Sequence, residues 1–212
     1  RSLILWEETL AERADLFRNT MDETQTRLLP GRCGYLAALN TQRISKKREA
    51  EPLGFERVTD RDVNPSVFNF SQVRPAEVID TFEGHDVLIN VSPLLHGHML
   101  LVPERSKLHK QVMTSEVIAM CLRWIATSTR PDFKILFNSL GAWSSVNHLH
   151  VHGVFTSCLF PSNKFPVEEQ PAQSSLGEGI DLLEYPIHCV RMVICADVAR
   201  QAWSLVEVLL DL

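Results

Sequence analysis

The sequence predicts an α+β fold, in which an antiparallel sheet carries a row of histidines and helices pack on the sheet and lie at both ends of the chain. Residues 77–82 and 86–91 are β-rich runs on either side of Glu83-Gly84-His85, which is typical of a β-hairpin. Residues 147–153 alternate histidine with aliphatic residues, the period-two pattern of a strand. Apolar residues at the spacing of one helix face over residues 114–128 predict the packed helix.

The other elements of the N-terminal part follow in order. Residues 4–19 set apolar positions among acids and arginines and predict an amphipathic helix. Residues 28–34 are rich in turn formers and lead into a short strand at 35–39. Residues 42–48 hold four cations and indicate a solvated loop, although they are also the only concentrated positive charge that could meet a phosphate. Residues 51–66 are predicted to be loop.

The C-terminal part begins with a strand at 133–137, followed by a small polar loop that contains glycine at 138–145. Residues 160–179 hold three prolines and predict a long surface loop. A further strand is expected at 187–194. Apolar residues over 198–212 have helical spacing and predict an amphipathic helix whose apolar stripe would need a partner.

Composition limits the classes of protein. The chain has 212 residues, 45% apolar and 22% charged, as soluble globular proteins do, and is long enough for one large domain or a domain and a half. Its net charge of −5 argues against a nucleic-acid binder but allows a small phosphorylated ligand held by a few local cations. No run reaches the ~18 apolar residues of a membrane helix, and the first residues are too soon followed by acids for a signal peptide. Five cysteines without a CxxC pair predict reduced thiols in a cytoplasmic protein.

The histidine row points to chemistry. On a strand His148, His150 and His152 would share one face, each roughly 7 Å from the next, with Leu149 and Val151 on the other. Three neutral imidazoles could hold zinc. Alternatively, the central imidazole is a nucleophile that its neighbours orient and supply with protons. The third interpretation is a polar row on a half-buried strand, and the spacing alone does not separate metal from nucleophile.

Two further segments carry a resemblance to a known family. Asn90-Val91-Ser92-Pro93, with Gly97-His98-Met99-Leu100-Leu101-Val102-Pro103 and the histidine row, resembles the histidine-triad superfamily of nucleotide hydrolases and transferases. Its GDP-D-glucose phosphorylase branch, to which plant GDP-L-galactose phosphorylases are related, is the closer match. That similarity is spread over about residues 5–155 and includes Gln25-Thr26-Arg27-Leu28-Leu29-Pro30-Gly31, Phe68-Asn69-Phe70 and Phe137-Asn138-Ser139-Leu140.

The resemblance implies a histidine-triad-like sheet and a reaction. GDP-D-glucose and inorganic phosphate would give glucose 1-phosphate and GDP through a GMP–histidine intermediate, so a GDP-hexose and phosphate are the expected partners. His150 falls on the family nucleophile. His152 would donate to the α-phosphate, and His148 would position the row. No metal or other cofactor belongs to this set of residues.

The resemblance also implies binding residues. Asn90 would contact the ribose, Asn138 and Ser145 the phosphates, and His98 would support the row from behind. Without the resemblance, Asn90 and Asn138 are equally well explained as caps of turns, and His98 as a core histidine.

The family continues past this length into a second half that resembles the first without the histidines. We therefore expect residues 1–155 to form a catalytic region, and residues 156–212, a loop with a strand and a helix, to be part of a shortened second half. Two alternatives stay open: a histidine-triad hydrolase that uses water, and a truncated, non-catalytic relative that binds a nucleotide or a partner chain. A homodimer is compatible with the apolar stripe at 198–212.

Overall fold

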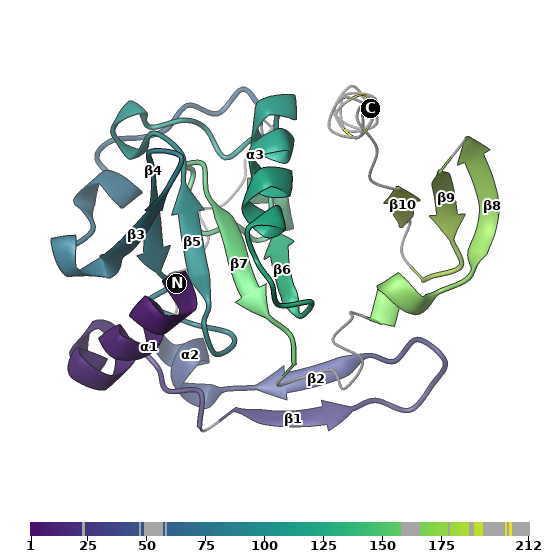
Figure 1. The fold of residues 1–212 in the computed structure, drawn as a ribbon, viewed down its shortest axis with the longest axis horizontal. Helices are drawn as coiled ribbons and strands as arrows, with labels where there is room; N and C mark the ends of the chain where they lie inside the picture. Colours follow the sequence, from purple (N-terminus) through teal and green to yellow (C-terminus); the bar gives the residue numbers. More distant parts are fainter. Residues whose placement is uncertain are drawn as a thin grey trace. The chain divides into compact units, whose positions relative to one another are not determined.

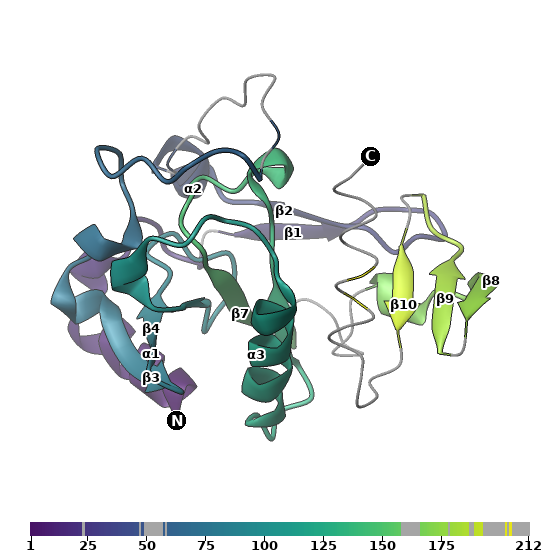
Figure 2. The same ribbon diagram turned by 90° about the horizontal axis from the view of Figure 1, so that it is seen from above.

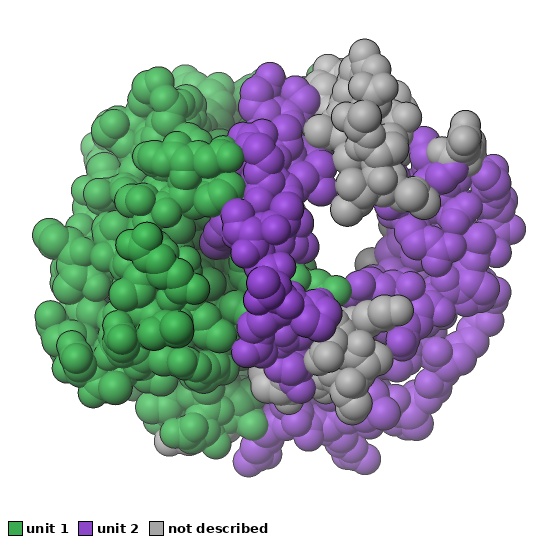
Figure 3. Space-filling view, in the orientation of Figure 1, with its two compact units in different colours: residues 1–24, 40–112, 133–155 green, residues 25–39, 113–132, 156–212 purple. Residues whose placement is uncertain are grey.

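The structure is a computed structural model that describes residues 1–22, 24–46, 48, 57, 59–157, 166–177, 179–186, 189–192, 202 and 204. The chain divides into two compact units (Figure 3). The first contains residues 1–24, 40–112 and 133–155, and the second contains residues 25–39, 113–132 and 156–212. The division at residue 155 into a catalytic region and a shortened second half stays a prediction.

The first unit is built on a five-stranded antiparallel sheet of order β3-β4-β5-β7-β6 (Figure 1). The strands are β3 (Val78–Phe82), β4 (His85–Ile89), β5 (Met99–Val102), β6 (Phe133–Leu136) and β7 (Val151–Phe155). All four residues of β5 are buried, as expected of the central strand. The α+β class and the antiparallel sheet are confirmed, whereas the likeness to a histidine-triad fold stays a prediction.

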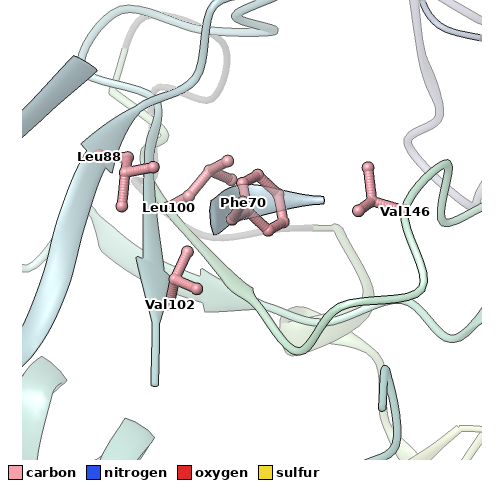
Figure 4. Close-up of a cluster of buried hydrophobic side chains, with 5 residues drawn as sticks. All are labelled: Phe70, Leu88, Leu100, Val102 and Val146. Carbon is pink, nitrogen blue, oxygen red and sulfur yellow. The ribbon is translucent and has the colours of Figure 1, made fainter. Parts of the chain in front are cut away.

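The predicted hairpin joins β3 to β4. Glu83 and Gly84 both have positive φ, 49° and 81°, as two-residue hairpin turns require, because this turn matches the twist of the strands it joins. The hairpin and β5 contribute to a cluster of buried hydrophobic side chains: Phe70, Leu88, Leu100, Val102 and Val146. Figure 4 shows leucine and valine side chains from β4 and β5 gathered beside the Phe70 ring. Fully burying side chains of this size stabilises a fold by roughly 1.5–3 kcal/mol each.

The predicted helix at 4–19 is two elements, α1 (Ser2–Glu12) and the 3₁₀ turn η1 (Ala14–Leu16). Trp6 of α1 is fully buried, and its indole N–H donates to the carbonyl oxygen of His98 at 3.2 Å. Gly97, with φ +71°, allows close packing here, since a Cβ would lie 2.7 Å from side-chain carbons of Leu3 and Phe155. The Gly97-His98 pair is thus fixed between α1 and the sheet.

Short helical segments connect the remaining parts of the first unit. Residues 42–46 of the cationic run predicted as a loop belong instead to α2 (Thr41–Lys46), which Asn40 caps by accepting from the Arg43 N–H at 2.9 Å. Arg48 lies outside this helix, as predicted, and residue 47 is not described. The 3₁₀ turns are η2 (Phe70–Gln72), η3 (Pro75–Glu77), η4 (Arg105–Lys107) and η5 (Leu140–Ala142). Residues 57 and 59–66 contain no helix or strand, as predicted; residues 51–56 and 58 lie outside the described part.

In the described part of the second unit lie two small antiparallel sheets and the helix α3 (Ser115–Ala126). β1 (Gln25–Leu28) and β2 (Leu36–Leu39) form a separate two-stranded ribbon, visible in Figures 1 and 2. β8 (Ala172–Gly177), β9 (Ile180–Leu183) and β10 (Val190–Met192) form the second sheet. The long loop predicted for 160–179 is therefore wrong from residue 172. Residues 172–176 are all exposed, so no alternation of burial marks the strand, and pairing with β9 defines it. Before β8 lies the 3₁₀ turn η6 (Pro166–Glu169).

The predicted helix at 114–128 is confirmed as α3 (Ser115–Ala126), and the Thr114 hydroxyl caps it by accepting from the Val117 N–H at 3.3 Å. Its packing on the histidine-bearing sheet stays a prediction. The predicted helix at 198–212 lies outside the described residues except for 202 and 204. Cys33, Cys121 and Cys189 carry free thiols, as predicted, and Cys158 and Cys195 are not described. Within the described residues, no helix combines the length and apolar composition that crossing a membrane requires.

Candidate active site

A cavity of about 500 Å³ lies over one face of the first unit's sheet, within the ~300–1,000 Å³ typical of small-molecule sites. Strand register places Leu88 and Leu100 opposite each other on β4 and β5. It also places His152 of β7 between Leu100 and Leu136 of the neighbouring strands. Directly opposed residues share a face, and all four line the cavity. The sheet therefore supplies an apolar floor with one imidazole set into it.

The loops around this floor bring in nearly all of the polar residues that the sequence singled out. Asn90, His98, Asn138, Ser145 and His150 all line the same cavity. These residues come from three separate stretches of the chain, so the fold gathers them as the sequence predicted. His148 is the exception, because it is completely buried and is not part of the lining.

The prediction that the three histidines share one strand face is wrong. β7 begins at Val151, so only His152 lies on the strand. The preceding backbone pairs elsewhere: the Leu149 N–H donates to the His109 carbonyl at 2.7 Å. The His150 N–H and carbonyl are both held by the side chain of Gln111, at 2.8 and 3.1 Å. An amide side chain thus takes the place that a neighbouring strand would have occupied.

The hydrogen bond of His150 determines which of its ring nitrogens is reactive. Its Nδ1 lies 2.7 Å from the carbonyl oxygen of His148, and a carbonyl can only accept. The proton therefore sits on Nδ1, and Nε2 keeps its lone pair. Among the described residues no hydrogen-bond partner occupies Nε2, and the residue lines the cavity while being only 4% exposed. This is the form of histidine that can act as a nucleophile.

His98 and His152 form a directed chain of hydrogen bonds. The Leu94 N–H donates to His98 Nδ1 at 3.0 Å, so the His98 proton is on Nε2, which lies 2.9 Å from His152 Nδ1. His152 then carries its proton on Nε2 and donates it to Asn138 Oδ1 at 3.1 Å. The Asn138 amide nitrogen donates in turn to the Ala142 carbonyl at 3.1 Å. The Leu94 N–H at one end of this series of hydrogen bonds and the Asn138 amide at the other fix the tautomers of both imidazoles.

The other predicted residues take different positions around this chain. Asn90 accepts from the Ser92 N–H at 2.9 Å, and its amide nitrogen lies 3.1 Å from His98 Nε2. Both of those nitrogens carry hydrogen in this tautomer, so the Asn90 N–H groups remain available to an acceptor in the cavity. The Ser145 hydroxyl lines the cavity without a hydrogen-bond partner among the described residues. His148 Nδ1 accepts from the Phe70 N–H at 3.0 Å, which fixes the loop that carries His150.

The site keeps its imidazoles neutral. Burial, with a smaller contribution from neighbouring histidine or arginine charges, lowers the pKa of His98, His150 and His152 to about 3. At His150 the bond to the His148 carbonyl opposes this shift of the pKa. Burial, with smaller contributions from His109 and Arg105, lowers the pKa of His148 to about 4. At pH 7 all four rings are therefore uncharged, and the His150 lone pair is present.

Positive charge at this cavity comes from arginines instead. Arg18, Arg43 and Arg48 line it, and the last two belong to the cationic run that the sequence marked as a candidate phosphate contact. Burial lowers the pKa of Arg43, and burial together with the charge of Arg18 lowers that of Arg48 to about 10, so both guanidinium groups stay protonated.

Sequence reasoning missed Gln111. This residue is completely buried, and its side-chain nitrogen also donates to the Asn138 carbonyl at 3.0 Å. One amide therefore connects the main chain of His150 to the main chain of Asn138, whose side chain accepts from His152. No pattern marks this residue, since it is a lone glutamine in an irregular segment, and only the folded chain brings it to the site.

The zinc interpretation finds no support in the donor geometry. In the described part of the chain, no group of three or more His, Cys, Asp or Glu side chains is placed to hold a metal ion. The imidazole nitrogens instead pair with carbonyl, amide and N–H groups.

Comparison with known proteins agrees with this geometry. The model of the family described as "GDPGP1-like, N-terminal domain" matches residues 2–154. The chain belongs to this family. It is 37% identical over 163 residues to GDP-D-glucose phosphorylase 1 of Danio rerio, which covers 74% of this chain and 45% of the relative. It is 36% identical over 170 residues to the Homo sapiens protein of the same name, with 74% and 42% coverage.

A plant relative extends the family. The chain is 31% identical over 208 residues to GDP-L-galactose phosphorylase 1 of Arabidopsis thaliana, which covers 88% of this chain and 46% of that protein. The chain thus spans less than half the length of the curated relatives it matches. No solved structure gives a significant match.

Proposed function

We propose that this chain carries the nucleotidyl-transfer site of a GDP-hexose phosphorylase, with His150 as the nucleophile. The reaction is the phosphorolysis of GDP-D-glucose to GDP and glucose 1-phosphate. The observation that carries the proposal is the His150 tautomer, in which Nδ1–H is donated to the His148 carbonyl and the Nε2 lone pair is left in the cavity. The names of the relatives support the choice of a GDP-hexose as substrate.

The chemistry needs two displacements at one phosphorus. The His150 Nε2 lone pair attacks the α-phosphorus, an N–P bond forms, and the bond from that phosphorus to the bridging oxygen breaks. Hexose 1-phosphate leaves as a stable anion and needs no proton. An oxygen of inorganic phosphate then attacks the same phosphorus, the N–P bond breaks, and GDP leaves with the His150 lone pair restored. The hydroxyl hydrogen of HPO₄²⁻ stays on the new terminal phosphate, so atoms, charge and protons balance.

The neighbouring residues have supporting roles in this proposal. The ring centre of His152 lies 5.0 Å from that of His150. We assign its Nε2–H, which is donated to Asn138 Oδ1 in the free site, to an α-phosphate oxygen once the nucleotide is bound. His98 and Asn138 fix the His152 tautomer. Ser145 and Asn90 present free polar groups for the nucleotide, and His148 positions His150 through its carbonyl.

The test is a product and adduct analysis of the full chain. With GDP-glucose alone, we expect an acid-labile GMP adduct on His150; with phosphate added, we expect GDP and glucose 1-phosphate. His150→Ala should abolish both, whereas His85→Ala, which removes an imidazole outside the cavity lining, should abolish neither. Release of GMP that does not depend on phosphate would identify a hydrolase instead. A chain that binds GDP-glucose without forming the adduct would be the non-catalytic relative.

A further inference from the structure

Within the described residues, three guanidinium groups at this cavity, those of Arg18, Arg43 and Arg48, form no ion pair with a carboxylate. The carboxylate in the described cavity lining is that of Glu77, which pairs with Arg74 at 2.7 Å and only partly offsets the charge of Arg48. The charges of Arg18 and Arg48 oppose each other, as the lowered pKa of Arg48 reflects. Partly buried like charges without a partner are unfavourable, and an anion placed among them relieves the cost.

The fold holds two of these arginines on one turn. The Arg18 N–H donates to the Val91 carbonyl at 2.7 Å, and the Arg43 Nε donates to the Ser92 carbonyl at 3.4 Å. The Asn19 side chain adds a bond to the Pro93 carbonyl at 3.1 Å. Three consecutive carbonyl groups after β4 therefore anchor the loop that contains Arg18 and the helix that contains Arg43.

The remaining arginine and the helix are held as well. The Arg48 guanidinium lies 3.4 Å from the centre of the Phe68 ring, a cation–π contact that orients its plane. Asn40 caps α2 and also donates to the Thr20 carbonyl at 2.7 Å, which connects the helix to the segment that follows Arg18. The segments of Arg18 and Arg43 are thus fixed to one another, and the Arg48 side chain is held against Phe68.

This cationic group adjoins the histidine chain. The charge of Arg43 acts on both His98 and His152, whose rings line the same cavity as Arg18 and Arg48. An anion held by the arginines would therefore lie beside the group that His150 attacks. Guanidinium groups bind phosphate through paired, charge-assisted hydrogen bonds, which makes phosphate the fitting ligand.

We infer that Arg18, Arg43 and Arg48 form the site for the phosphate that is exchanged: the phosphate of the departing hexose 1-phosphate and then the inorganic phosphate that replaces it. The order of occupancy rests on the proposed function. In a double displacement at one phosphorus, the leaving group and the acceptor both lie opposite the nucleophile, so a single anion site serves both steps. The arginines thereby select phosphate as the acceptor.

The test titrates inorganic phosphate into the full chain by calorimetry at constant ionic strength. Loss of one charge-assisted hydrogen-bonding group should weaken phosphate binding about tenfold to hundredfold. We expect this loss in Arg43→Gln and in Arg48→Gln. The matched control is Lys46→Gln, which removes the same charge from α2 at an exposed residue outside the cavity lining and should leave affinity unchanged. Equal affinity in Arg43→Gln and Lys46→Gln, or no phosphate binding by the parent chain, would overturn the inference.

A second measurement needs no variant. Phenylglyoxal modification of the parent chain, mapped by mass spectrometry, should be slowed by phosphate at Arg18, Arg43 and Arg48 but not at exposed Arg27 of β1. Absence of selective protection would contradict the site. The outcomes also separate the two proposals. Arginine-dependent phosphate binding without a GMP adduct would refute the enzymatic proposal alone, and adduct formation with arginine-independent phosphate binding would refute the arginine site alone.

Discussion

Acidification from pH 6.5 to pH 5.5 should lower the free energy of unfolding by about 4 kcal/mol. Burial holds the folded pKa values of His98, His148, His150 and His152 at about 3 to 4, below the ordinary 6.5. Between these values the unfolded chain binds protons that the folded chain does not, so stability falls as pH falls. Each histidine contributes about 1 kcal/mol over this interval, which gives about 4 kcal/mol for the four.

The interval from 6.5 to 5.5 isolates the histidines from the carboxylates. Asp132, whose pKa is lowered chiefly by its bond to Arg130, and Glu104, bonded to Lys107, stabilise the fold above their unfolded values near 4. Their contribution is lost only at lower pH. The sign is the same for both groups, but the windows differ. A loss of stability that begins above pH 5.5 therefore reports on buried imidazoles.

The assay is urea unfolding of the full chain at pH 7.5, 6.5 and 5.5. His148→Gln checks the contribution of a single histidine. The substitution removes one buried imidazole, while the oxygen of the new glutamine side chain can still accept from the Phe70 N–H. The loss of stability from pH 6.5 to pH 5.5 should then be smaller by about one quarter. A free energy of unfolding that stays flat over this interval, or rises with acid, would refute the conclusion that these imidazoles are buried and neutral.

Two further predictions concern stability around the site. Gln111→Met should cost about 3 kcal/mol or more and slow adduct formation, because it leaves three buried main-chain groups without a partner at about 1 kcal/mol or more each; unchanged unfolding and adduct rates would disprove its positioning role. Gly97→Ala should cost about 2–4 kcal/mol, since strain at positive φ adds to the contact with Leu3 and Phe155. Gly84→Ala, at φ +81° with open space around it, isolates the strain and should cost about 1–2 kcal/mol; equal losses in the two variants would exclude the steric part.

The elements predicted well from the sequence are those that have a recognisable residue pattern and that pair with a segment close by in the sequence. The hairpin of β3 and β4 consists of two β-rich runs joined by a turn that tolerates positive φ, and both signals are local. β8 has neither, since its exposed polar residues gain their strand geometry from β9. The histidine row shows the converse error. Its alternation is that of a strand, but the main-chain N–H and carbonyl of His150 bond to the Gln111 side chain and not to a neighbouring strand.

Only those residues of the candidate site that stand in a recognisable sequence motif could be predicted from the sequence. His150, His152 and Asn138 stand in a motif, and the fold brings them to one cavity. Arg18 and Arg43 are separated in sequence and meet only because both are bonded to carbonyl groups of one turn. A buried amide and a pair of distant cations carry no local signature, so the structure was needed to find them.

The hydrogen bonds of the site also bear on which acceptor the proposed intermediate would meet. Water must lose a proton as it attacks, so hydrolysis would need a basic nitrogen beside the α-phosphorus. Every lone pair of the neighbouring imidazoles is occupied: His98 accepts from the Leu94 N–H, His152 from His98, and His148 from the Phe70 N–H. The free lone pair of His150 would itself be bonded to phosphorus in the adduct. Phosphate arrives already ionised and needs no base, so this network of neutral imidazoles favours phosphate over water as the acceptor.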